Sequence, residues 1–169
     1  TSSRTGGRAQ APPTEAGGGS GAGRSVVPRP FAEKTVLFAF HLEAAANNSA
    51  GDLALGWFID EAGLETGPMT LAPPEGFENG FGDWSVEGGV WQVGTHTGPG
   101  APIVFAGTNV VGTILAGNYG AFRDTRLVTP EFVVPDVVQA PRFSYHYWYQ
   151  IGVNDFGQLQ IRISGGEWQ

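Results

Sequence analysis

Glycine and proline recur every few residues along this chain, and their spacing constrains the fold more than any other feature. The sequence of 169 residues holds 27 glycines and 12 prolines. Both residues are unfavourable inside helices, so these interruptions exclude an architecture built on long helices. The aromatic residues, 11 Phe, 5 Trp and 4 Tyr, still supply enough apolar area for a core. The chain therefore has to fold from short strands and turns.

Several segments carry the period-two pattern of strands. Positions 36, 38, 40 and 42 are apolar and would share one face of a strand. In segment 158–164 Leu159, Ile161 and Ile163 would point inward, with polar residues between them pointing outward. Segment 142–150 is aromatic on both sides, which predicts a central strand covered on both faces. Further strands are expected at 53–64, 84–86, 90–94, 110–115 and 126–134. This rhythm is typical of an antiparallel all-β sandwich.

Composition divides the chain into two parts. Residues 1–30 are rich in Gly, Pro, Ser, Ala and Arg and have no hydrophobic period, which predicts a flexible tail or linker. This part carries four Arg against one Glu, whereas residues 31–169 carry fifteen acidic and five basic side chains. The acidic body should repel phosphate groups, so we expect no nucleic-acid partner.

Two further classes are excluded by composition. The chain has no cysteine, so disulfide scaffolds and thiolate metal sites are excluded. No run of 18 apolar residues exists, so we expect no membrane-spanning helix.

The residues that usually carry catalysis do not form a recognisable motif. The three histidines lie in separate segments, and the sequence contains no H-E-x-x-H, no G-x-S-x-G and no phosphate-binding loop. His41 and His146 are predicted to be hydrogen-bonded residues within strands. His96 lies in the expected loop 95–98, where it could contact a ligand. We therefore expect the chain to have no catalytic residues and not to be an enzyme.

An ordered set of motifs resembles a known family. The motifs are GFENGFGDWSVEGGVWQVG at 76–94, NVVGTILAGNY at 109–119, RLVTPEF at 126–132, RFSYHYWY at 142–149 and GQLQIRISGGEW at 157–168. Together they resemble the MAM-like jelly-roll modules of secreted bacterial proteins. That pattern is related to the cleaved-adhesin domains and to the accessory domains of immune-inhibitor-A-type metallopeptidases. The resemblance implies an antiparallel, concanavalin-like jelly-roll sandwich at an extracellular or cell-surface location.

The order of two segments departs from that family. Segments 34–42 and 56–62 resemble the strands that usually close such a module, yet here they precede the rest. The chain could therefore be a window on a tandem array, or a circularly permuted sandwich in which 31–66 holds the closing strands and 76–169 the opening ones. We favour one compact unit, because half a module would expose strand edges and half a core. A third possibility is that a neighbouring subunit completes an open edge with its own strand.

The resemblance also implies a structural cation. Asp60 and Glu78 would approach each other if their strands are neighbours, and Asn79, Asp83 and Glu61 could add oxygen ligands of the kind that Ca²⁺ prefers. The alternative is that Glu78 bonds only to a turn and Asp60 is solvated.

Exposed aromatic rings on jelly-roll modules often stack on sugars. Candidates for such a site are Trp84, Trp91 and Tyr119, and also Trp148 and Trp168. The alternative for all of them is packing in the core.

These observations favour a non-catalytic adhesion, structural or accessory module of a larger secreted protein or assembly. Its partners would be other domains or identical subunits, joined by strand-edge pairing into an oligomer. The second interpretation is a carbohydrate-binding module that serves a hydrolase. The third is a fragment of a secreted metallopeptidase whose active site lies elsewhere.

Overall fold

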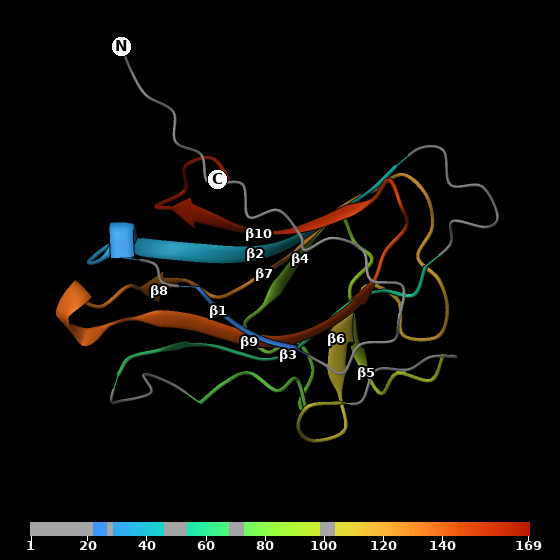
Figure 1. The fold of residues 1–169 in the computed structure, drawn as a ribbon, viewed down its shortest axis with the longest axis horizontal. Coiled ribbons are helices and arrows are strands. Elements are labelled where there is room, and N and C mark those ends of the chain that lie inside the picture. The colour runs from blue at the N-terminus through green and yellow to red at the C-terminus, as the bar shows by residue number, and fades with distance from the viewer. Residues whose placement is uncertain (1–21, 27–28, 46–53, 68–72, 99–103) are drawn as a thin grey trace, which may run out of the picture.

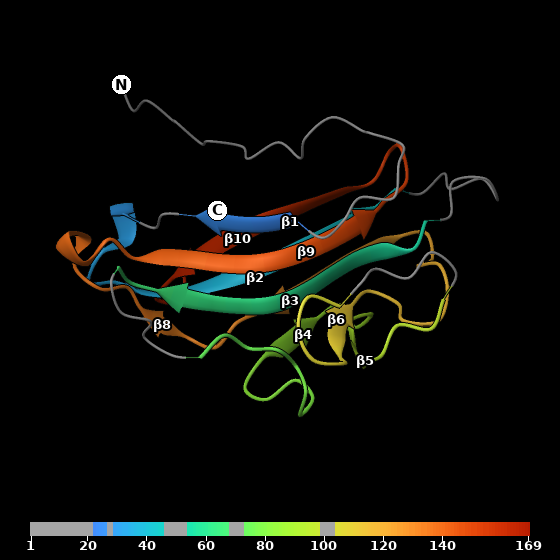
Figure 2. The same ribbon diagram turned by 60° about the horizontal axis from the view of Figure 1, so that its bottom comes forward.

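The computed structural model describes residues 22–26, 29–45, 54–67, 73–98 and 104–169. This part of the chain folds into two antiparallel sheets packed face to face (Figure 1, Figure 2). Its helical turns are limited to η1 (Arg29–Phe31) and η2 (Val137–Gln139). No helix within these ranges is long and apolar enough to cross a membrane. The predicted all-β sandwich is thus confirmed, while the jelly-roll connectivity stays a prediction.

Each sheet follows a path that mixes early and late segments of the chain. Sheet A has the order β1 (Ala22–Val26), β9 (Arg142–Gln150), β3 (Gly56–Glu65), β6 (Val110–Gly112) and β5 (Gln92–Gly94). Sheet B has the order β10 (Phe156–Ile163), β2 (Thr35–Ala44), β7 (Arg123–Val128) and β4 (Ser85–Glu87), and β8 (Phe132–Val133) also pairs with β2.

The early segment 31–66 supplies an interior strand to each sheet. In sheet B, β2 lies between β10 and β7, and its register with β10 runs from Val36↔Ile163 to Glu43↔Phe156. In sheet A, β3 lies between β9 and β6. The inner edge of β10 is therefore paired within the same chain. Segments 31–66 and 76–169 therefore contribute strands to the same sandwich.

Two expectations differ from the structure. Residues 22–26, expected to belong to the tail, form β1 because they pair with β9, and Arg24 Nε donates to the Tyr147 hydroxyl at 3.4 Å. The expected tail residues 1–21 lie outside the described residues. The single strand expected at 126–134 is divided into β7 and β8, since Pro130 has no N–H to donate. The Thr129 hydroxyl lies at this break and accepts a bond from the Phe38 N–H at 3.0 Å.

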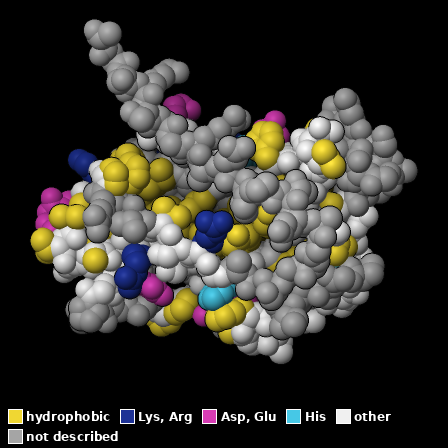
Figure 3. All heavy atoms as spheres, in the orientation of Figure 1, with side chains coloured by type: hydrophobic (Ala, Val, Ile, Leu, Met, Phe, Trp, Pro, Cys, Tyr) yellow, Lys and Arg dark blue, Asp and Glu magenta, His cyan; other side chains and the backbone are white. Residues whose placement is uncertain are grey.

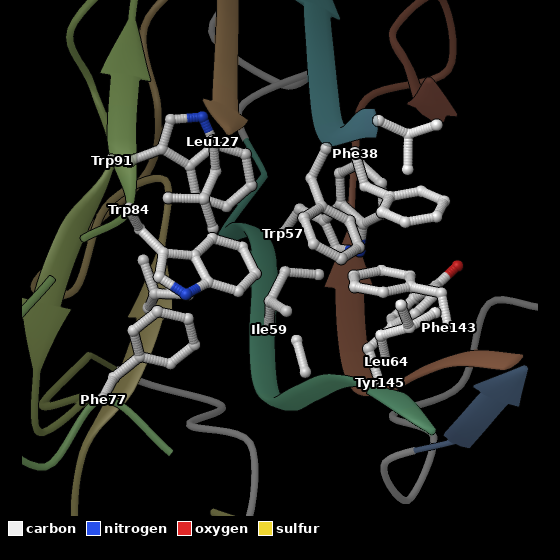
Figure 4. Close-up of a cluster of buried hydrophobic side chains, with 14 of the residues drawn as sticks. Phe38, Trp57, Ile59, Leu64, Phe77, Trp84, Trp91, Leu127, Phe143 and Tyr145 are labelled. Atoms are coloured by element: carbon white, nitrogen blue, oxygen red, sulfur yellow. The ribbon is translucent and has the colours of Figure 1, made fainter. Parts of the chain in front are cut away.

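Aromatic side chains from both sheets fill the space between them (Figure 4). Phe38 stacks on Phe143 with ring centroids 4.1 Å apart, and Phe40 meets Tyr145 edge-on at 4.8 Å. The three aliphatic residues predicted to point inward from β10 pack against this cluster, while Gln158 and Gln160 bond to side chains of β2 and β7. The predicted alternation of β10 is confirmed.

A buried polar clamp joins three loops at one end of the sandwich. The Tyr119 hydroxyl donates to Asp155 Oδ2 at 2.5 Å and accepts from the Gly152 N–H at 2.8 Å. Asp155 Oδ1 also accepts from the Ala45 N–H at 2.7 Å. Burial, and then the bond to Asp155, raise the pKa of Tyr119 well above its usual range. The Tyr119 hydroxyl therefore stays protonated, and its hydrogen bonds hold the loops together.

Candidate functional site

A β-bulge in β3 places Glu61 near enough to three other carboxylates for their charges to act on it. The register of β3 with β9 shifts between Asp60 and Gly63, and Glu61 adopts a left-handed backbone with φ of 48°. Ala62 exchanges two backbone hydrogen bonds with Glu75, which places the segment around 75–78 beside the bulge. We call Asp60, Glu61, Glu75 and Glu78 the carboxylate cluster. Strained bulges of this kind are common next to functional sites.

Asp60 is the buried member of the cluster, with 4% of its surface exposed. Its Oδ1 accepts from the Glu61 N–H at 2.9 Å, and its Oδ2 accepts from the N–H groups of Phe105 and Ala106 at 3.1 and 3.2 Å. The side chain therefore fixes the start of the 104–109 loop.

Glu78 holds the other end of the same loop from the surface. Its Oε1 accepts from the N–H groups of Thr108 and Asn109 at 2.9 and 2.8 Å, and its Oε2 accepts from the Thr108 hydroxyl at 2.9 Å. Gly107 has φ of 67°, and a Cβ there would lie 2.3 Å from Glu78 Oε1, so only glycine allows this close approach. The two carboxylates thus hold the loop between them.

The environment changes the acidity of the cluster in opposite directions. Burial, and to a lesser extent the nearby charge of Glu78, raise the pKa of Asp60 against the lowering effect of its three N–H donors. Burial and the neighbouring Asp60 raise the pKa of Glu61, while His146 opposes that shift. Hydrogen bonds from Asn109 and Thr108 lower the pKa of Glu78. The charges of the other three carboxylates of the cluster therefore all raise the pKa of Glu61.

An aromatic pair borders the carboxylate cluster. The rings of Phe105 and His146 stack with their centroids 3.3 Å apart and an interplanar angle of 11°, and Phe105 remains 58% exposed. On β1, Gly23 lies so close to the imidazole that an added Cβ would be 3.0 Å from its Cε1. The Nδ1 of His146 is buried and has no hydrogen-bond partner among the described residues. The expectation that His146 would be a hydrogen-bonded strand residue is thus not met at this nitrogen.

The predicted metal ligands are only partly gathered. Asp60 and Glu78 meet through the 104–109 loop, whereas Asn79 and Asp83 are exposed on the turn that follows Glu78. Within the described ranges, no three acidic or histidine side chains are arranged to hold a metal ion. Carboxylate oxygens are the ligands that a hard cation prefers, and in this structure those of Asp60 and Glu78 accept hydrogen bonds from the 104–109 loop. Sequence reasoning missed Glu75, because only the Ala62–Glu75 bridge brings it to the bulge.

The rings suggested for sugar binding lie in the core. Trp84 and Trp91 are 7% and 5% exposed, and Tyr119 is fully buried in the clamp described above. Both tryptophans pack in the central aromatic cluster (Figure 4). A sugar cannot stack on these three rings without displacing the core, so they are corrected to structural residues. Of the other two candidates, Trp148 packs on Phe58, and Trp168 lies 4.3 Å under the Arg162 guanidinium.

No family model, curated protein or solved structure matches this chain.

Proposed function

We propose that the chain is a non-catalytic module that serves adhesion, structure or accessory contacts within a larger extracellular protein or assembly. The fixed carboxylates described above support this proposal. Asp60, Glu78 and Asp155 all accept hydrogen bonds from backbone N–H groups, and so they hold loops in place. Asp60 and Glu78 each use three of their roughly four acceptor sites in this way and Asp155 uses two, which suits them to positioning loops.

The observation that carries the proposal is the placement of exposed apolar side chains at the two ends of the sandwich. Val133, Val137 and Val138, on β8 and η2, are 67%, 47% and 85% exposed. Phe122 and Val153, in loops at the other end, are 74% and 84% exposed. The register of β2 separates these ends, since Thr35 pairs with Val133 and Ala44 with Arg123.

Grouped apolar side chains on a surface favour contact with another protein surface. Hydrophobic side chains are visible at the β8 and η2 end in the space-filling view (Figure 3). A module that contacts its neighbours end to end would present apolar residues in this way. We name the set of Val133, Val137 and Val138 the valine end.

The valine end gives a direct test of this function. We expect the apparent mass by light scattering to rise with protein concentration, and replacement of all three valines by threonine to suppress that rise. The melting temperature should change little, because exposed substitutions usually alter stability by less than about 0.5 kcal/mol. The matched control is Phe105→Ala, which removes an exposed apolar ring beside His146 in the middle of β9, away from both ends.

The competing carbohydrate-binding hypothesis predicts a different pattern. A chain that stays monomeric at every concentration and is retarded in a glycan affinity gel would replace the proposed function with that one. Hydrolysis of a glycan or peptide substrate by the purified chain would contradict a non-catalytic role.

We further propose that the carboxylate cluster binds Ca²⁺ as a structural ion. The favouring observation is that the bulge and the Ala62–Glu75 bridge bring several carboxylates close to one another, where burial and the charges of neighbouring carboxylates raise the pKa of Asp60 and of Glu61. A cation would offset both effects. Other hard cations would satisfy the same oxygens, so the choice of Ca²⁺ rests on the family resemblance. Its role would be to stabilise the bulge and the 104–109 loop.

Calcium titration tests this second proposal. We expect millimolar CaCl₂ to raise the melting temperature and excess EDTA to reverse the rise, because a ligand that binds only the folded state stabilises it. Asp60→Asn should remove the response, whereas Asp83→Asn, outside the cluster, should keep it. An identical melting temperature in CaCl₂ and in EDTA would exclude the structural cation.

A further inference from the structure

His96 occupies an apolar position without any hydrogen-bond partner for its ring. The residue is 7% exposed, and both Nδ1 and Nε2 are buried and unpartnered among the described residues. Its ring meets Phe58 edge-on at 4.7 Å and 87°. A Cβ on Gly98 would lie 3.2 Å from its Cε1 and Nε2, so the backbone of Gly98 covers the ring closely. Leaving both nitrogens unsatisfied has a cost that a neutral ring tolerates and a charged ring does not.

His41 is a buried histidine with the opposite arrangement. His41 is 4% exposed and thus equally buried. Its Nε2 lies 2.8 Å from Asp124 Oδ1, and its Nδ1 lies 3.0 Å from Gln158 Nε2. The ring of His41 thus has a carboxylate partner, whereas the ring of His96 has none among the described residues.

Within the part of the chain that the structure describes, no charged side chain acts on the ring of His96. Between Gly88 and Gly117, His96 is the only ionisable residue in the sequence. On β3 and β9, the acidic or histidine residues closest in sequence to Phe58 and Trp148 are Asp60 and His146. Asp60 is bonded to the 104–109 loop and His146 is stacked on Phe105. Burial alone lowers the pKa of His96 below its ordinary value.

The ring also closes a short segment over the outer face of sheet A. The Thr97 N–H donates to the Leu115 carbonyl at 3.1 Å, which ties segment 95–98 to the loop after β6. Leu115 belongs with Leu55, Phe58 and Val110 to a small apolar cluster on this face. Release of segment 95–98 would leave part of this cluster without its cover.

We propose that His96 is an acid-sensitive latch: its neutral ring holds segment 95–98 over the apolar cluster around Phe58, and protonation releases the segment. The sign follows from linkage. A histidine whose pKa is lowered by folding gives stability that is complete above its free value, about 6.5, and is lost as the pH falls through the folded value. The ratio of the closed to the open state should therefore fall by up to about tenfold for each pH unit between the free and the folded pKa of His96.

Amide hydrogen exchange at Thr97 measures the opening of segment 95–98 directly, because this N–H is protected by its bond to Leu115. In the wild-type chain, the protection factor of the Thr97 amide, corrected for intrinsic exchange, should fall by up to about tenfold per pH unit below pH 6.5. The Phe38 amide, bonded to the Thr129 hydroxyl in the core, should keep its protection. His96→Phe, which fills the site and cannot titrate, should make the Thr97 protection independent of pH. The matched control is His41→Gln, which should leave the pH dependence of Thr97 intact.

Three results would overturn the latch. One is the same pH dependence of Thr97 in the wild type and in His96→Phe. Another is a parallel loss of protection at Phe38, since that would be global unfolding. The third needs no variant: an NMR titration of the His96 Cε1 proton with a midpoint at or above pH 6.5 would show that the ring is not penalised by burial. None of these results bears on the module function, whose test is the concentration dependence of the mass.

Discussion

Replacing Phe40 by alanine is expected to lower the free energy of unfolding by about 3–5 kcal/mol, measured by urea or thermal denaturation. Phe40 is fully buried at the centre of β2, and its ring contacts Trp57 at 5.5 Å and Tyr145 at 4.8 Å. These contacts join sheet B to two strands of sheet A. Alanine removes the transfer free energy of the ring and leaves a cavity that the surrounding aromatic side chains cannot fill without leaving their rotamers.

Phe122→Ala is the matched control for this prediction. Phe122 is 74% exposed in the loop before β7, so its loss should change the free energy of unfolding by less than about 0.5 kcal/mol. Equal effects of the two substitutions would mean that β2 is not the interior strand of the sandwich.

The second large effect is expected for Tyr119→Phe, which removes only one oxygen atom. That oxygen donates to Asp155 and accepts from the Gly152 N–H. Without it, a buried carboxylate and a buried N–H both lose a partner while the ring packing stays the same. We expect a loss of about 2–3 kcal/mol in the free energy of unfolding, because unsatisfied buried polar groups carry their full desolvation penalty.

Tyr149→Phe provides the comparison for Tyr119. Tyr149 is half-buried and stacks on Tyr147 at 5.9 Å. Its hydroxyl makes no hydrogen bond within the described ranges, so its removal should be close to neutral. If Tyr119→Phe were as mild as Tyr149→Phe, the loop clamp would contribute nothing to stability.

Strands whose residues alternate over a long stretch could be predicted from the sequence, because the pleat imposes a period of two on one buried face. The patterns of β2 and β10 are of this kind, and both strands lie where the local pattern placed them. β1 could not be found in this way. Its sequence AGRSV has no apolar face, and it is a strand because it pairs with β9. β8 was separated from β7 by Pro130, whose effect on the ladder depends on the partner strand.

The site was harder to predict than the fold, because its members meet through long-range contacts. Asp60 and Glu78 were expected to approach each other, and the 104–109 loop between them supplies the contact. Nothing local marks that loop as their partner, since its backbone N–H groups, rather than its side chains, make most of the bonds. Likewise, a tryptophan in the sequence does not reveal whether its ring faces solvent. Trp84 and Trp91 proved to be core residues once both sheets were placed.

The central claim is that segments 31–66 and 76–169 form one sandwich within a single chain, and the pair Phe40↔Leu159 tests it most directly. The N–H of Ile161 points away from β2 and donates to the Gln169 carbonyl, so Ile161 is not hydrogen-bonded to its partner on β2. Residues two positions apart on a strand repeat this pattern, so Leu159 and Phe40 also form a non-hydrogen-bonded pair, whose Hα atoms lie close together. Isotope-filtered NMR on a mixture of labelled and unlabelled chains distinguishes contacts within one molecule from contacts between molecules. A sandwich formed within one chain should give a strong Hα–Hα cross-peak between these residues within one labelled molecule. If the cross-peak is absent, or appears only between different molecules, the two segments do not form one sandwich within a single chain.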